Sequence, residues 1–153
     1  MADKKIAAAQ HDTIGAWTKR CYLAGRAAME DALRPYGLGG ATQWYVLYQL
    51  VNAGPTRQRD LQRILQVERA TLSAVVIALV RKKLVEQVPD SVDQRQKLLR
   101  LTEIGEVLWS DLPDLTRIHA VAFDGIDADD VETALRVLRT ATERLEQRQR
   151  TEQ

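Results

Sequence analysis

The most constraining feature of this 153-residue sequence is a pair of short amphipathic segments separated by two residues. The first is predicted to be a helix from about Arg57 to Leu65, and the second a helix from about Glu68 to Lys82. In both segments apolar residues recur at spacings of three and four, as they do in helices with one buried face. Only Gln66 and Val67 separate the two, which requires a tight turn. This arrangement predicts a helix-turn-helix.

The leading end of the second segment indicates what the pair does. It carries Arg69, Thr71 and Ser73, which are small or polar side chains with no packing role at that position. In a helix-turn-helix protein, the first residues of the second helix contact base edges in the major groove of DNA. The polar leading end therefore favours a DNA-binding element.

A β-hairpin is predicted directly after the second segment. Val85–Val88 and Lys97–Leu101 are short strand candidates, and the stretch between them contains Pro89 and several turn-forming residues. The second candidate alternates apolar and charged residues, which is typical of a strand with one buried face. The tip, from Asp93 to Lys97, is charged. A hairpin of this kind at this place in the chain predicts the wing of a winged helix-turn-helix.

Further helices are predicted on both sides. Ile6 to about Pro35 forms a long amphipathic helix, and Thr42–Val51 a short one that is apolar nearly all round and therefore buried. After the hairpin, Thr102 is the expected N-cap of a helix that Pro113 kinks. Asp127, three residues before a second aspartate, resembles the capping box of the last helix. We expect a mainly α protein with a small β-hairpin wing and six helices, in the order α-α-α-α-β-β-α-α.

Charge is distributed unevenly along the chain. Between Pro55 and Leu101 there are ten cations and five anions, whereas the remainder has 12 cations and 16 anions. The net charge of +1 for the whole chain hides this asymmetry. A basic segment inside an otherwise acidic molecule is the electrostatic pattern expected of a surface that faces phosphate.

The remaining composition is that of one soluble domain, with 45% hydrophobic and 28% charged residues. The longest apolar run, Ala74–Val80, is too short to span a bilayer, and the polar N-terminus gives no sign of a secretion signal. A single cysteine, Cys21, cannot form an internal disulfide and fits a reducing compartment. We therefore expect a cytoplasmic protein with no membrane partner and no cofactor.

Several short motifs occur in order and without gaps from about Leu38 to Leu108. The most specific is in the wing, where Asp-x-Arg at positions 93–95 is followed by Leu-x-Leu-Thr at 99–102. The others are Gly54-Pro55, Gln58–Leu61, Ala70–Ser73, Leu84-Val85, Pro89-Asp90 and Gly105. Together they resemble the MarR family of winged helix-turn-helix transcriptional regulators. The resemblance implies a DNA-binding domain at residues 38–102 and a helical dimerisation region at residues 1–37 and 103–153.

The same resemblance implies a two-fold dimer whose second helices enter successive major grooves. The operator would then be near-palindromic, with half-sites about 10 base pairs apart. Arg95 would reach the minor groove, where the negative potential attracts arginine, and Asp93 would hold its guanidinium. Arg57, Gln58 and Lys97 are candidates for phosphate contacts. The residues expected to face the major groove are Arg69, Ala70, Thr71, Ser73 and Ala74.

Three positions depart from the family pattern. Ala74 and Gln87 stand where the family usually has arginine, and Lys83 stands where it usually has glycine. The missing arginine on the reading helix bears on the strength or site preference of base contact. Lys83 is expected in a left-handed turn, which costs a non-glycine residue on the order of 1 kcal/mol.

A small aromatic or phenolic effector is a further candidate partner, since relatives in this family can bind aromatic acids between their dimerisation and DNA-binding regions. The aromatic residues in the parts that would border such a cavity are Trp17, Tyr36, Trp44, Tyr45 and Trp109. Of these we assign Trp17, Tyr36 and Trp44 to the site, with Arg20 or Arg26 as the candidate to pair with an acid. Core packing explains the same aromatic residues more simply.

Cys21 and the two histidines are weaker candidates for a sensing role. Cys21 is either a redox-active thiol or, in the interpretation that we favour, a small buried hydrophobe on the apolar stripe of the first helix. His11 and His119 lack the spacing of a metal site, and we expect no metal.

The sequence thus favours a homodimeric transcriptional regulator that binds specific double-stranded DNA, acting as a repressor released by a small-molecule or other signal. No activated-nucleophile motif or glycine-rich phosphate loop is present, so an enzyme is not expected. The alternative is a ligand- or protein-binding dimer of the same fold that has lost DNA reading, which would be consistent with Ala74.

Overall fold

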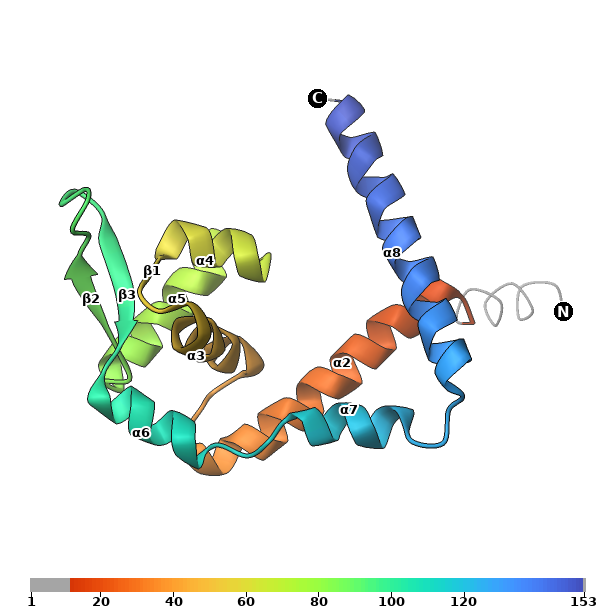
Figure 1. Ribbon diagram of the computed structural model, residues 1–153, viewed down its shortest axis with the longest axis horizontal. Helices are drawn as coiled ribbons and strands as arrows, with labels where there is room; N and C mark the ends of the chain where they lie inside the picture. The colour runs from red at the N-terminus through yellow and green to blue at the C-terminus, as the bar shows by residue number, and fades with distance from the viewer. Residues whose placement is uncertain (1–11, 153) are drawn as a thin grey trace, which may run out of the picture. The chain divides into compact units, whose positions relative to one another are not determined.

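The computed structural model describes residues 12–152 and forms two compact units, which divide in the sequence between Leu115 and Thr116. The first unit contains helices α2 to α6 and a small sheet, and the second contains α7 and α8 (Figure 1). This mainly helical architecture with a β wing confirms the predicted fold class. Within the described range, no helix is both long and apolar enough to cross a membrane.

The first described helix, α2 (Ile14–Leu33), starts at a side-chain cap. The Thr13 hydroxyl accepts a hydrogen bond of 3.2 Å from a backbone N–H of the first turn. The helix passes directly into a 3-10 turn, η1 (Arg34–Tyr36), and Gly37 then takes a left-handed φ of 72°. The end of this helix agrees with the prediction, and the predicted start at Ile6 lies outside the described residues.

Three helices form the core of the first unit: α3 (Ala41–Ala53), α4 (Gln58–Leu65) and α5 (Arg69–Arg81). Helix α3 contacts both of the others, and α4 contacts α5. Their burial of apolar surface is the main term that stabilises this unit. The structure confirms the predicted helix-turn-helix pair, α4 and α5. The fully buried side chains of the three helices are Val46, Leu47, Leu61, Leu72 and Leu79.

Two non-glycine residues adopt left-handed backbone conformations. Gln66, between α4 and α5, has φ of 50°, and Lys83, after α5, has φ of 59°. The conformation at Lys83 was expected, whereas that at Gln66 was not. The end of α5 closes with N–H bonds from Lys83 to the Val80 carbonyl (2.9 Å) and from Leu84 to the Leu79 carbonyl (3.0 Å). This is the hydrogen-bond pattern that a left-handed residue permits at a helix C-terminus.

The sheet contains β1 (Thr56–Arg57), β2 (Val85–Pro89) and β3 (Lys97–Leu101), in the antiparallel order β1-β3-β2. Strands β2 and β3 are the predicted hairpin. Strand β1 was not predicted, because two residues are too few to show a periodic pattern. Arg57 of β1 lies opposite Leu98 of β3, so the sheet joins the start of α4 to the wing.

Helix α6 (Glu103–Asp111) begins against the base of the wing. The Thr102 hydroxyl accepts from the Gly105 N–H at 3.1 Å and donates to the Lys83 carbonyl at 2.5 Å, which confirms Thr102 as the N-cap. A Cβ atom at position 105 would lie 2.1 Å from the carbonyl oxygen of Leu84. Only glycine fits this close approach without a shift of the backbone.

The sequence predicts one kinked helix through Pro113, but the structure has two separate helices. Helix α6 ends at Asp111, and α7 (Thr116–Phe123) follows in the second unit. The cause is visible at Leu112, whose ψ of 147° is the extended conformation that proline favours in the residue before it. The predicted kink is therefore a break.

The last helix, α8 (Ala128–Thr151), has Asp127 as its N-cap, as predicted. The Asp127 carboxylate accepts from the Asp129 N–H at 2.8 Å rather than from that of Asp130. The cap is therefore an aspartate turn over two residues and not the expected capping box.

Replacing Gly105 with alanine should destabilise the protein, although alanine is the better helix former. We expect a loss of roughly 1–3 kcal/mol in the free energy of unfolding, as for overpacking of a filled site, measured by urea denaturation. The matched control is Gly25→Ala in α2, where an added Cβ meets nothing within 4 Å. That change should be neutral or stabilise by up to about 1 kcal/mol. Equal responses of the two variants would contradict the close approach at Gly105.

Candidate nucleic-acid interface

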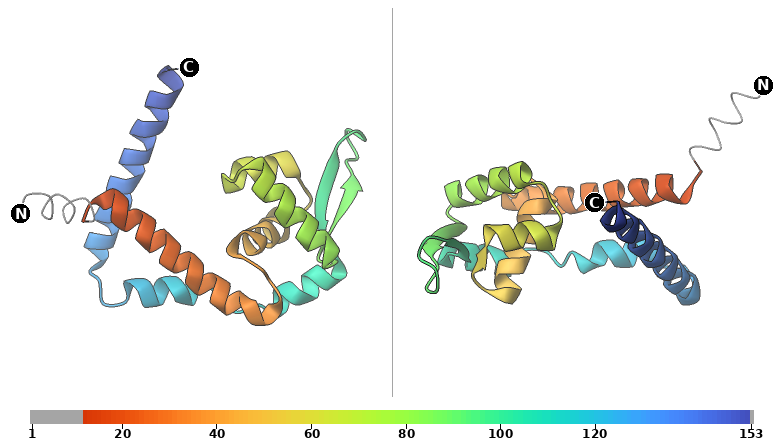
Figure 2. Two further views of the ribbon diagram at one scale, coloured as in Figure 1. Left: turned by 180° about the vertical axis from the view of Figure 1, so that it is seen from behind. Right: turned by 90° about the horizontal axis from the view of Figure 1, so that it is seen from above.

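Helix α5 presents its leading end to solvent. Seen from behind in Figure 2, it crosses the front of the first unit, and the hairpin of β2 and β3 rises beside it. The contact between α5 and β2 fixes this arrangement. Four of the five residues predicted to face the major groove are exposed, namely Arg69, Ala70, Thr71 and Ala74.

Ser73, the fifth, is half-buried and contacts another predicted site residue. Gln58 Nε2 donates a hydrogen bond of 3.1 Å to Ser73 Oγ. This contact joins the first residue of α4 to the second turn of α5 and helps to fix the crossing of the two helices. A direct DNA contact by either side chain stays a prediction.

Asp93 organises the tip of the wing. Its carboxylate accepts from the backbone N–H of Arg95 at 3.1 Å and from the side-chain amide of Gln96 at 3.0 Å. The expectation that Asp93 holds the Arg95 guanidinium is therefore wrong, because the carboxylate binds the backbone two residues on, as turn-forming aspartates do. The Arg95 and Lys97 side chains are exposed.

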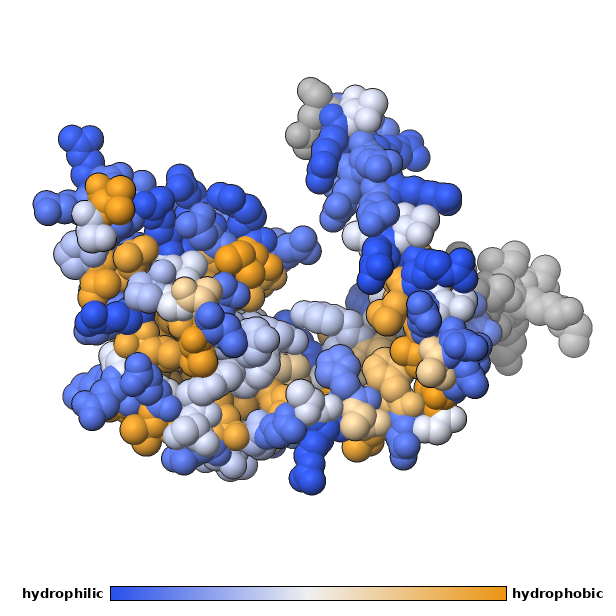
Figure 3. Space-filling model, in the orientation of Figure 1, coloured by the Kyte–Doolittle hydropathy of each residue, from blue (hydrophilic) through white to orange (hydrophobic). Residues whose placement is uncertain are grey.

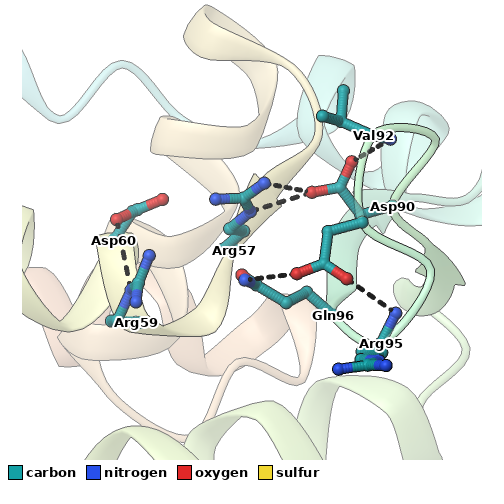
Figure 4. Close-up of polar contacts among 8 residues, drawn as sticks. Arg57, Arg59, Asp60, Asp90, Val92, Arg95 and Gln96 are labelled. Carbon is teal, nitrogen blue, oxygen red and sulfur yellow. Dashed lines mark hydrogen bonds and ion pairs between the residues drawn. The ribbon is translucent and has the colours of Figure 1, made fainter.

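A buried ion pair anchors the wing where β2 enters the turn of the hairpin (Figure 4). Two guanidinium nitrogens of Arg57 donate to Asp90 Oδ2, the Nε at 2.9 Å, and Asp90 Oδ1 accepts from the Val92 N–H at 2.9 Å. Only 5% of the Asp90 side chain and 28% of the Arg57 side chain are exposed. The pair connects β1 to the end of β2. The sequence assigned Arg57 to a phosphate contact and gave no sign of this partner, which lies 33 positions away.

These contacts set the protonation of Asp90. The Val92 N–H and then the Arg57 guanidinium lower the pKa of Asp90, while the hydrogen bonds to Asp90 raise the pKa of Arg57. A carboxyl group whose pKa is lowered by folding stabilises the folded state above its unfolded pKa. That contribution is lost as the pH falls through the folded pKa.

Replacing Asp90 with asparagine should destabilise the protein at neutral pH, because it leaves Arg57 partly buried without a counter-charge. The difference in unfolding free energy from wild type should narrow as the pH falls from about 4, the ordinary pKa of an unfolded aspartate, toward the lowered pKa of folded Asp90, where the wild-type carboxylate also loses its charge. Urea denaturation at several pH values measures this difference. Glu86→Gln is the control, because the exposed Glu86–Arg100 pair of the same sheet is expected to contribute little. A difference that does not change with pH would argue against the ion pair.

A second polar contact, also not predicted, holds the C-terminal end of α5. Lys82 Nζ donates to the Gly37 carbonyl oxygen at 2.5 Å and to Gln43 Oε1 at 2.9 Å. Gln43 is buried and also accepts from the Gly39 N–H at 3.3 Å. Burial lowers the pKa of Lys82. The sequence could not distinguish this lysine from the other cations of the basic segment.

The four residues assigned to an effector site belong to three elements of the first unit, α2, η1 and α3. The Arg20 guanidinium carbon is 5.0 Å from the ring centre of Trp17 on α2. Tyr36 belongs to η1, and Trp44 stacks on Tyr48 within α3, with ring centres 5.1 Å apart. Their combination into one effector site therefore stays a prediction.

A groove with a volume of about 850 Å³ lies between α3, the base of the wing and α6. Its lining includes Trp109, one of the aromatic residues expected to border an effector cavity, but none of the four residues assigned to the site. It combines the side chains of Leu50 and Trp109 with the carboxylates of Glu103 and Glu106.

Cys21 is exposed on α2, so the interpretation that we favoured, a buried hydrophobe, is wrong for the single chain. The apolar stripe around it is also exposed, with Trp17 at 54%. A redox role for Cys21 stays untested. His11 lies outside the described residues. The His119 ring stacks on the Phe123 ring, with ring centres 6.2 Å apart. No cluster of three metal-ligating side chains occurs within residues 12–152.

The helix pair, the hairpin packed beside α5 and the basic tip of that hairpin define a winged helix-turn-helix. Residues 36–96, which contain most of these elements, match the MarR family. This match agrees with the resemblance to the MarR family that the motifs predict.

A curated relative supports this assignment. The chain is 30% identical over 98 residues to the HTH-type transcriptional repressor NicR of Pseudomonas putida, covering 63% of this chain and 62% of NicR. The chain thus spans about three fifths of the length of the curated relatives that it matches.

Solved structures share the fold over most of the chain. A probable transcriptional regulator from Pseudomonas aeruginosa has a TM-score of 0.72 and 27% identity, covering 89% of this chain and 98% of that one. BpsR of Bordetella bronchiseptica, whose DNA binding is regulated by 6-hydroxynicotinic acid, has a TM-score of 0.75. It is 23% identical, covers 86% of this chain and 94% of its own, and is evidence for the fold alone.

Proposed function

We propose that this protein is a homodimeric transcriptional regulator that binds specific double-stranded DNA. The observation that carries the proposal is the exposure of three cations on the two elements that a winged helix-turn-helix presents to DNA. These are Arg69 at the start of α5, and Arg95 and Lys97 at the tip of the wing. None of the three has an ion-pair partner among the residues that the structure describes.

Ion pairing divides the basic segment into two groups. Arg57 pairs with Asp90 and Arg100 with Glu86, so these arginines already have counter-charges within the sheet. Arg59 and Arg63 both pair with Asp60. The cations of the segment without an ion-pair partner among the described residues are Arg69, Arg81, Lys82, Lys83, Arg95 and Lys97. Such cations release counterions from DNA when they contact phosphate. This release is the source of the sequence-independent affinity of a protein for DNA.

We assign the roles within the interface accordingly. Arg69, Ala70, Thr71 and Ala74 would face base edges in the major groove, and Arg95 would enter the minor groove. Lys97 would contact phosphate. The remaining predicted residues would act through these elements: Gln58 and Ser73 by fixing α5, and Arg57 and Asp93 by fixing the wing.

Arg95→Ala should weaken binding to a selected operator by roughly 1–3 kcal/mol, because it removes the charge placed in the minor groove. Fluorescence anisotropy measures the change, and wild-type binding should fall steeply between about 50 and 200 mM salt. Arg34→Ala is the matched control, because Arg34 is exposed, pairs with Asp31 and lies outside the basic segment. Equal losses in the two variants would contradict the role of the wing. Weak binding without sequence preference would favour the alternative, a ligand- or protein-binding dimer.

The dimerisation region, proposed as residues 1–37 and 103–153, leaves apolar side chains exposed in the single chain. Figure 3 shows hydrophobic residues at the surface around α7 and the start of α8. Large apolar patches on soluble proteins usually mark interfaces, and a second copy of the chain would cover these. The exposed residues are Trp17, Tyr22 and Leu23 on α2, and Leu135, Leu138 and Leu145 on α8.

Leu135→Asp should therefore shift the protein toward monomer, because a charge cannot be buried in such an interface without a partner. Sedimentation velocity measures the distribution of monomer and dimer. Thr140→Asp is the control, because position 140 is exposed on the opposite side of the same helix. A monomeric wild type, or an unchanged dimer in Leu135→Asp, would argue against an interface on this face of α8.

We propose further that the protein acts in the cytoplasm as a non-catalytic repressor released by a small aromatic or phenolic effector. The names of the relatives support this, since NicR is a repressor and the DNA binding of BpsR is regulated by an aromatic acid. An effector can release DNA only if it binds one of two dimer states more tightly than the other. Trp17, Arg20, Tyr36 and Trp44 stay the residues assigned to it.

A further inference from the structure

The outward face of α5 is mostly apolar. Leu72, Val76 and Leu79 are buried and define the inward face of this helix. An α-helix repeats every 3.6 residues, so the opposite face consists of positions 70, 74, 77 and 81. Ile77 is the largest apolar side chain on it and is 59% exposed. The four residues of this outward stripe are Ala70, Ala74, Ile77 and Arg81, all exposed.

The surroundings of the stripe indicate what covers it. Arg69 stands at the start of the same helix and Arg81 at its end, and neither has an ion-pair partner within residues 12–152. A single exposed apolar side chain needs no explanation, but three in one line between two unpaired cations do. Charge complementarity favours a polyanion that has apolar groups at its surface.

Duplex DNA meets that description at one kind of base pair. In the major groove guanine, cytosine and adenine present only hydrogen-bond donors and acceptors, whereas thymine also presents its 5-methyl group. Alanine and isoleucine side chains form no hydrogen bonds, so Ala70, Ala74 and Ile77 can gain energy only from apolar contact. From Ala70 to Ile77 the helix rises about 10 Å, the length of about three base pairs.

We infer that α5 reads thymine methyl groups through Ala70, Ala74 and Ile77. This inference rests on the proposed DNA-binding function and specifies the sequences that would be bound. Each half-site contains thymines within a run of about three or four base pairs in the major groove. Ala74 then contacts a thymine methyl group itself. The absence of the family's usual arginine at that position therefore changes the preferred base and does not abolish recognition.

The experiment begins with selection of wild-type sites from random duplexes. Each thymine of the selected half-site is then replaced, one at a time, by deoxyuridine, which pairs with adenine identically and lacks only the 5-methyl group. At one or more positions, loss of the methyl group should weaken binding about fourfold, the effect of removing one buried methyl.

Ile77→Ala assigns the contact to its side chain. In this variant the deoxyuridine effect should disappear at one position of the half-site and persist at the others, as a double-mutant cycle detects. Ile64→Ala is the matched control, because Ile64 is also exposed (52%) but lies on α4, outside the stripe. It should leave every deoxyuridine effect unchanged.

Ala74→Arg tests the stripe in the opposite direction. An arginine at this position can form a bidentate contact with guanine, so the variant should select guanine where the wild type selects another base. Thermal denaturation confirms that the variants of these exposed positions remain folded.

The outcomes separate the two levels of the proposal. Sequence-specific binding that deoxyuridine leaves unchanged at every thymine would overturn methyl reading and leave the proposed function intact. An unchanged site preference in Ala74→Arg would likewise overturn the placement of the stripe over the bases. Failure of the wild type to select any sequence would instead contradict the proposed function.

Discussion

The position of the wing depends on the carboxylate of Asp90. One of its oxygens accepts from the Arg57 guanidinium of β1, and the other accepts from a backbone N–H of the wing itself. Because Arg57 directly precedes α4, this one side chain joins the turn of the hairpin to the first helix of the helix-turn-helix. The three-stranded sheet provides the same connection through backbone pairing, and the ion pair adds a side-chain contact to it. Interfaces that contact DNA at two grooves need such a fixed relation between their parts.

Local patterns in the sequence predicted what is local in the structure. Helices α4 and α5, the hairpin and the Thr102 cap follow from apolar periodicity, turn residues and capping preference. What was missed depends on contacts between distant positions, such as the pairing of Arg57 with Asp90, or on segments too short to show a period, such as β1. The break at Pro113 shows a third kind of error, because the sequence located the proline but did not decide between a kink and an end.

The candidate site shows the same division. The cations Arg69, Arg95 and Lys97 could be named from the sequence, since the resemblance to a family assigns them; the structure adds that they are exposed and have no ion-pair partner within residues 12–152. The sequence could not separate them from Arg57, Lys82 and Arg100, which are equally basic and occupy the same segment. Only the fold shows that these three have acceptors within the protein. The exposure of Cys21 was also not predicted. An apolar stripe on a helix indicates that the stripe packs against something, but not whether the packing partner belongs to the same chain.

The contact of Lys82 links two parts of the first unit that are otherwise joined through α3. Its ammonium group bonds the carbonyl of Gly37, in the turn that ends the α2–η1 segment, and the buried side chain of Gln43. Lys82 itself directly follows α5. A displacement of that turn must therefore either carry the C-terminal end of the reading helix with it or break two hydrogen bonds to a partly desolvated cation. Lys82 thus connects the C-terminal end of α5 directly to the turn that follows α2 and η1.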